Sequence, residues 1–123
     1  MKTLTKAEEQ VMQVLWKLER AFLRDIVEAM PAPKPHQNTV ATILRILAEK
    51  KFAAINVMGR QHQYYTLVSK EEYSQSTIRQ VVKNYFNGSF RNAVSFMVKE
   101  KNITLQELEI LMTEIRNQQK LKK

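Results

Sequence analysis

Apolar residues recur at helical spacing in three segments near the start of the chain, and each segment predicts a short helix. The first helix is expected at about residues 6–18, because Thr5 and Glu8 fit a capping box just ahead of an apolar stripe. The second is expected at roughly residues 23–30, and three closely spaced prolines directly after it end the helix. The third is expected from about Gln37 to Lys51. Its apolar face consists of Val40, Ile43, Leu44 and Leu47.

Two short β-like runs follow, Ala53–Val57 and Gln63–Val68, with Gly59 and its neighbours supplying the turn. Three helices followed by a hairpin are the element order of a winged helix-turn-helix. The sequence therefore predicts a mainly α fold with a small β-hairpin, in which a winged helix-turn-helix is followed by a helical tail.

The pattern beyond the hairpin is helical to the end. Ser69 with Glu72 and Thr104 with Glu107 fit further capping boxes, and Asn87–Gly88 breaks the stripe between them. In the helix expected after Asn87–Gly88, the side chains of Phe90, Ala93, Val94 and Met97 are expected to face inward. The last stretch has the a and d spacing of a helix seam, at Leu105, Leu108, Met112 and Ile115.

The pattern divides the chain into a predicted winged-helix domain, residues 1–69, and a predicted helical dimerisation region, residues 70–123. The apolar stripes of the second region need a cover. They can fold back on the winged helix, or two copies can interlock across a two-fold axis. The dimer is favoured, because a protein that binds two DNA half-sites one helical turn apart gains affinity.

Composition narrows the class of protein. The apolar fraction is 44%, which suits a globular core, and there is no cysteine, which excludes disulfides and zinc ribbons. No apolar run approaches the ~18 residues that a membrane span needs. The first ten residues are charged and polar, unlike a signal peptide. We therefore expect a cytoplasmic protein without membrane insertion.

The net charge of +8 points to a polyanionic partner such as nucleic acid. The excess is dense between residues 34 and 66, where the single acid is Glu49. The basic residues of this segment are Lys34, Arg45, Lys50, Lys51 and Arg60.

The third helix carries the candidate recognition chemistry. Asn38, Thr42, Arg45 and Glu49 lie opposite its apolar face, with Thr39 on one flank. Asn can bond adenine, Arg can bond guanine or phosphate, and Thr can touch a thymine methyl or a phosphate. A solvated polar face is the other interpretation, because surface helices ordinarily have one. The neighbouring proline-rich turn and the basic hairpin tip with Arg60 favour DNA.

Catalytic and cofactor chemistry has little support. His36 and His62 have no cysteine or helix-spaced carboxylate beside them, and only two glycines are present for a phosphate loop. We therefore expect neither an enzyme nor a bound metal or cofactor.

Several runs of the sequence together resemble the penicillinase repressor family over nearly the whole chain. They are Thr5–Trp16, Thr39–Leu44, Leu47 with Lys50, Gly59-Arg60 with Tyr64-Tyr65, Val68–Tyr73, Phe86–Ser89 and Leu105–Leu111. The resemblance implies a homodimeric winged-helix repressor that binds a short palindromic operator and dimerises through its C-terminal helices. It also implies DNA contacts at Thr39, Thr42, Lys50 and Arg60, and, as in several members, a β-lactam-responsive sensor protease that leads to cleavage in the tail.

The chain departs from the family pattern at several places. Ile46 and Lys51 stand where the family usually has Arg and Gly, so Arg45 either substitutes for that Arg or the operator preference differs. Ser95-Phe96-Met97 stands at the family's Asn-Phe cleavage site, which leaves that site unmatched. The cysteine-rich tail of copper-responsive members is missing, so copper sensing by that route is excluded.

The sequence and the resemblance thus predict a dimeric repressor of transcription that binds a specific operator in double-stranded DNA. The genes it controls are expected to form an operon of the β-lactam-resistance type. The alternative is a winged-helix adaptor that binds another protein and not DNA. Such an adaptor would expose an apolar patch on the third helix, and Ile46 is the only residue there that suggests one. The predicted DNA-binding residues are Lys34, Asn38, Thr39, Thr42, Arg45, Lys50 and Arg60. The predicted dimerisation residues are Leu105, Leu108, Leu111, Met112 and Ile115. The candidate proteolytic region is Ser95, Phe96 and Met97.

Overall fold

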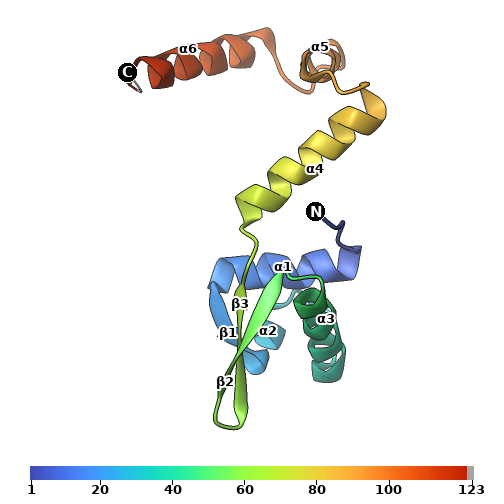
Figure 1. Ribbon diagram of the computed structural model, residues 1–123. Coiled ribbons are helices and arrows are strands. Elements are labelled where there is room, and N and C mark those ends of the chain that lie inside the picture. The colour runs from blue at the N-terminus through green and yellow to red at the C-terminus, as the bar shows by residue number, and fades with distance from the viewer. Residues whose placement is uncertain (122–123) are drawn as a thin grey trace. The chain divides into compact units, whose positions relative to one another are not determined.

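The computed structural model describes residues 1–121, and these form six helices and one three-stranded antiparallel sheet (Figure 1). Residues 122 and 123, the last of the predicted helical region, lie outside the described part. The elements in order are α1 (Lys6–Leu18), β1 (Arg20–Phe22), α2 (Leu23–Ala29), α3 (Gln37–Glu49), β2 (Ala53–Met58), β3 (Gln61–Thr66), α4 (Lys70–Tyr85), α5 (Phe90–Lys99) and α6 (Leu105–Leu121). Contacts group the chain into two units, Met1–Thr77 and Ile78–Lys123. The predicted fold class is confirmed.

The first unit buries the apolar faces of α1, α2 and α3 in one core. Val11, Leu15, Ile26 and Leu44 are fully buried there. The start of α1 is fixed by the predicted capping box: the Thr5 hydroxyl accepts the amide of Glu8, and the Glu8 carboxylate accepts the amide of Thr5. None of the helices in residues 1–121 combines the length and apolar character that crossing a membrane requires.

The sheet has one strand more than the sequence predicted. The strand order is β1-β3-β2, and β1 pairs antiparallel with β3, with Arg20 opposite Tyr65. This strand has only three residues, too few for an alternating pattern to be recognised. The second hairpin strand also begins earlier than predicted, at Gln61, because Gly59 (φ +65°) and Arg60 alone form the turn after Met58.

The end of α3 lies earlier than predicted. The last helical residue is Glu49, Lys50 is the C-cap, and Lys51 adopts a left-handed conformation with φ +65°. The amides of Lys51 and Phe52 donate to the carbonyls of Ala48 and Leu47, which is the Schellman pattern. Because glycine tolerates this conformation best, the glycine usual in the resembled family at position 51 has a structural reason.

An aromatic cluster joins the first turns of α4 to the first unit. The ring of Tyr73 lies 5.5 Å from that of Phe52 and 5.9 Å from that of Trp16. The Tyr73 hydroxyl accepts the amide of Leu4 at 3.0 Å, and the Trp16 indole donates to the Val68 carbonyl at 2.8 Å. These contacts explain why residues up to Thr77 group with the winged helix. The functional division into residues 1–69 and 70–123 stays a prediction.

The second unit contains the rest of α4, then α5 and α6. Asn87 and Gly88, both with positive φ, turn the chain after α4, and the predicted caps at Ser89 and Thr104 are present. Only Val82 and Ala93 are buried among its described residues. The prediction that Phe90, Val94 and Met97 face inward is therefore wrong for the single chain. Helical periodicity identified the stripe, but no part of the described chain covers it.

Candidate nucleic-acid interface

Helix α3 presents one buried and one exposed face, as its sequence predicted. Val40, Leu44 and Leu47 are fully buried, whereas Asn38 and Arg45 are exposed on the opposite side. The helix begins with an unusual cap, in which Nδ1 of His36 accepts the amide of Asn38 at 3.1 Å. The sequence analysis missed this role, because His is not among the strongly preferred capping residues.

The exposed face forms a strip of hydrogen-bonding side chains, Asn38, Thr42 and Arg45, which we call the reading strip. These residues are four and three positions apart, so they lie above one another along the helix. The Thr42 hydroxyl donates to the Asn38 carbonyl at 3.0 Å, which leaves its oxygen able to accept from a partner. Thr39 is exposed on another flank, beside a hollow that Pro31 and other residues of the proline-rich turn line.

The reading strip lies close to the wing, the hairpin formed by β2 and β3. Burial raises the pKa of the Tyr64 phenol on β3, and the positive charge of Arg45 opposes that rise. An interaction of this kind requires Arg45 to lie near the strand. Helix α3 also contacts β2. Helix α3 and the wing therefore pack within the same unit, with Arg45 on the side of the helix that lies near β3.

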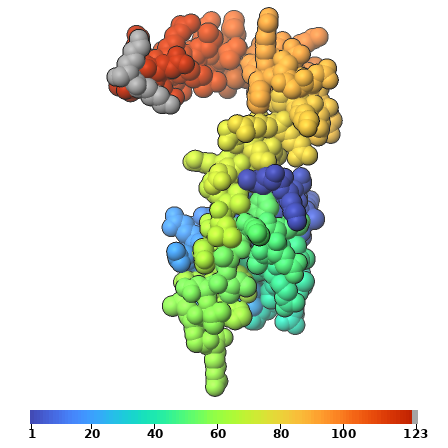
Figure 2. All heavy atoms as spheres, viewed as in Figure 1, coloured from blue at the N-terminus to red at the C-terminus, as the bar shows by residue number. Residues whose placement is uncertain are grey.

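The wing tip projects as a narrow finger of exposed residues (Figure 2). Arg60 lies in the two-residue turn at its end and is exposed. Tyr64 and Tyr65 alternate as a strand requires: Tyr64 is buried, and Tyr65 is half-buried with the Arg20 guanidinium 5.0 Å from its ring centre. The tip thus offers a cation at the far end of a two-stranded hairpin, which suits contact with a phosphate.

The two predicted phosphate ligands other than Arg60 have protein partners. The Lys34 ammonium donates to the Glu28 carbonyl at 2.8 Å, where it satisfies the C-terminal end of α2. The Lys50 ammonium lies 2.5 Å from the Glu8 carboxylate on α1. Lys34 is exposed, but Lys50 is largely covered, with 23% of its side chain accessible. The structure therefore does not gather Lys50 into the reading strip.

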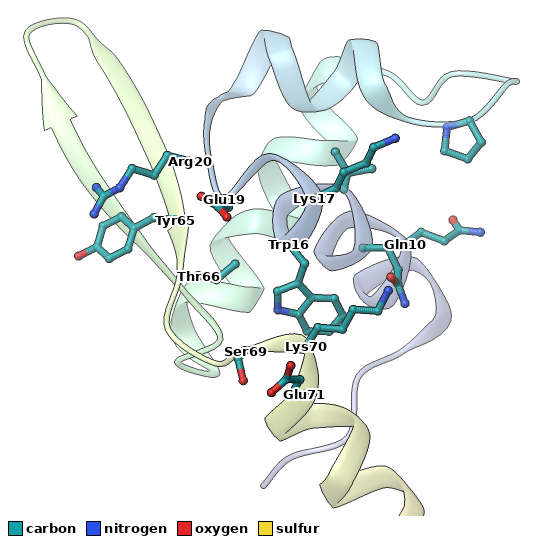
Figure 3. A pocket seen from close by; sticks show the side chains of 13 residues that line it. Gln10, Trp16, Lys17, Glu19, Arg20, Tyr65, Thr66, Ser69, Lys70 and Glu71 are labelled. Atoms are coloured by element: carbon teal, nitrogen blue, oxygen red, sulfur yellow. The ribbon is translucent and has the colours of Figure 1, made fainter. Parts of the chain in front are cut away.

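A cleft in the first unit differs in charge from the segment that forms α3 and the wing. Its walls come from α1, the sheet and the start of α4, and the Trp16 side chain lies between Tyr65 on one side and Gln10 on the other (Figure 3). Its charged residues are of both signs. They are Lys17, Glu19, Arg20, Lys70 and Glu71. Mixed charge is typical of a solvated surface, whereas the segment bearing α3 and the wing has a basic excess.

The predicted dimerisation residues lie on an exposed helix. No residue of α6 is buried, and Leu105, Leu111, Met112 and Ile115 expose 43–64% of their surface. Leu108 is half-buried. Ile110 is 60% exposed, but at 100° per residue it lies on the opposite side of α6 from these residues and is not part of their stripe.

The candidate proteolytic region is regular helix. Ser95, Phe96 and Met97 lie within α5, and the carbonyls of Phe96 and Met97 accept amides from the chain beyond the helix. The Phe96 ring packs 5.5 Å from that of Phe86. A protease would have to unfold this turn to reach its backbone.

Comparison with known proteins assigns the chain to a family. The family model described as penicillinase repressor matches residues 4–117. The chain belongs to the penicillinase repressor family. Members of this family repress transcription, so the chain is a transcriptional repressor.

Curated relatives within the penicillinase repressor family match the chain nearly end to end. The methicillin resistance regulatory protein MecI of Staphylococcus aureus is 25% identical over 109 residues, covering 88% of this chain and 89% of that protein. The protein of the same name from Mammaliicoccus sciuri is 24% identical, with the same coverage.

Solved structures also match. The CopR repressor structure is 29% identical, with a TM-score of 0.47, and covers 55% of this chain and 100% of its own. The structure of Bordetella bronchiseptica BpsR is 19% identical, with a TM-score of 0.49, and covers 82% of this chain and 76% of its own.

Proposed function

We propose that the protein represses transcription as a homodimer on a palindromic operator. In each half-site α3 lies in the major groove, with Asn38 and Arg45 bonding base edges and Thr42 contacting a thymine methyl or a phosphate. Arg60 on the wing and Lys34 at the turn contact phosphates, and Thr39 contacts DNA from the flank of α3.

The observation that carries this proposal is the composition of the exposed face of α3. A helix whose buried side fixes it to a core holds its opposite side chains rigidly, which is what base recognition requires. Here that opposite side carries amide, hydroxyl and guanidinium groups, with one carboxylate, Glu49, at the C-terminal end of the helix. No large apolar side chain there is exposed, since Ile46 is half-buried. An adaptor surface would need the reverse.

The proposal of a homodimer rests on α6. A stripe in which Met112 is exposed and Leu108 half-buried, at heptad spacing, is unfavourable in water, and an identical stripe from a second copy can cover it. Two copies related by a two-fold axis would present two copies of α3, which matches a palindrome.

The relatives' names indicate the kind of genes that are controlled. Proteins named for regulating methicillin resistance lead us to propose an operon of the β-lactam-resistance type, with a sensor protease relieving repression. The cut would fall in or near Ser95–Met97 of α5. Because this stretch is helical, cleavage requires local unfolding first.

Fluorescence anisotropy tests the proposal. A duplex is first selected by the protein from a random-sequence pool, and its affinity is compared with that of a scrambled duplex over a salt series. We expect the scrambled duplex to bind about 10³-fold or more weakly. Equal, steeply salt-dependent binding to both would leave only charge attraction and would support the adaptor instead.

A further inference from the structure

Glu8 is a buried acid in a basic, DNA-binding protein. It is the one charged side chain classed as buried among the described residues, with 6% of its surface exposed. A carboxylate in that position cannot contact DNA, because it is covered and would repel phosphates. Its burial has a cost unless its oxygens are satisfied, so its partners indicate its role.

Those partners connect two helices. One Glu8 carboxylate oxygen accepts the Thr5 amide at 3.1 Å and the Lys50 ammonium at 2.5 Å. Glu8 lies in the first turn of α1, and Lys50 is the C-cap of α3. Each charge also lies at the helix end that favours it, the acid at an N-terminus and the cation at a C-terminus. The pair thus ties the end of α3 to the beginning of α1.

We propose that Glu8 is a positioning residue for DNA recognition. Held by Lys50, it fixes the end of α3 against the first turn of α1 and so sets the angle of the reading strip. The inference rests on the proposed function, because it assigns that function's recognition helix a support outside the DNA interface. It also gives Lys50 a role different from the predicted phosphate contact.

Glu8→Gln separates these two roles of Lys50. Glutamine keeps the oxygen that accepts the Thr5 amide, so the cap of α1 persists, but the charge that holds Lys50 is lost. If the pair positions α3, affinity for the selected operator falls by about 5- to 10-fold. Affinity for the scrambled duplex stays as in the wild type, and so does the salt slope, which is the change of log affinity with log salt concentration. If Lys50 is a phosphate ligand, releasing it leaves operator affinity unchanged or raises it, which would overturn the proposal.

Lys50→Met is the second variant that tests the proposal. Positioning predicts the same loss of operator affinity, no change of salt slope, and a Glu8→Gln/Lys50→Met double variant no weaker than the worse single variant. A decrease of the slope by about one in Lys50→Met alone would identify a direct phosphate contact and contradict the inference.

Glu9→Gln is the matched control, since it removes the same charge from an exposed neighbouring position. It should leave operator discrimination as in the wild type. If the wild type itself fails to discriminate the selected from the scrambled duplex, the proposed function is wrong. If the wild type discriminates and Glu8→Gln does so equally well, only the positioning role is wrong.

Discussion

The two units of the chain are built from similar apolar stripes but use them differently. In the first unit, stripes on α1, α2 and α3 meet one another and the sheet, so that residues such as Val11 and Leu44 are fully buried. In the second unit, only Val82 and Ala93 are buried within the described residues. Helical periodicity alone does not distinguish these cases.

The contrast shows what a stripe can and cannot specify. Spacing in sequence determines which side chains share a face, but the cover must come from elsewhere in the chain or from another molecule. The first unit supplies its own cover and can hold a rigid recognition helix. The second does not, and we attribute its cover to a second copy.

The largest effect is expected from placing polar residues on the α6 stripe. Leu108→Gln with Met112→Gln should give monomers and lower operator affinity by about 10²-fold or more, because the two half-sites are then bound independently. Light scattering measures the mass, and anisotropy measures the affinity. Gln106→Ser, an exposed polar change on the same helix, should alter neither. An unchanged mass in the double variant would contradict the assignment of α6.

A smaller and more specific effect is expected on the reading strip. Arg45→Ala should weaken operator binding by about 1–3 kcal/mol and relax the preference at one base pair, while the mass of the dimer is retained. Binding to a set of single-base operator variants measures this. Unchanged specificity would mean that α3 does not read the bases.

Replacing Lys51 by glycine tests whether the stability of the first unit can be changed without affecting dimerisation. A left-handed conformation costs a non-glycine residue about 1–2 kcal/mol, and the greater freedom of unfolded glycine offsets part of that. Lys51→Gly should therefore raise the free energy of unfolding by about 0.5–1 kcal/mol in urea titrations, without changing dimer mass. A decrease would show that the lysine side chain makes a compensating contact.

The smallest effect expected is on the pH dependence of stability. Burial raises the pKa of Glu8, but the hydrogen bonds from Lys50 and Thr5, with the charge of Lys50, outweigh this and leave the pKa below its ordinary value. The ionised carboxylate thus stabilises the folded state above the unfolded pKa, and this contribution is lost as pH falls through the lowered one. Wild type and Glu8→Gln should converge in unfolding free energy over that acidic range. A constant difference between them would contradict the pKa direction.

Much of the fold could be predicted from local signals. The capping boxes at Thr5, Ser69 and Thr104 are all present, and the buried and exposed faces of α3 follow its sequence. Misplaced boundaries have local causes, such as the two-residue turn at Gly59 and the left-handed Lys51 that ends α3.

The features that were missed depend on residues far apart in sequence. The short strand β1 exists because β3 pairs with it, and the Glu8–Lys50 pair joins positions 42 residues apart. Neither leaves a periodic signal. The reading strip could be predicted because its residues share one helix, whereas the supporting contacts behind it could not.

Hydroxyl-radical footprinting on the selected duplex tests the central claim most directly, namely that one unit reads DNA and the other pairs two copies. The account predicts two symmetric protected stretches with centres about one helical turn, or 10–10.5 base pairs, or a whole multiple of it apart. The Leu108→Gln/Met112→Gln variant should lose both together at concentrations that saturate the wild type. A single protected stretch, or protection unaffected by that variant, would contradict the account.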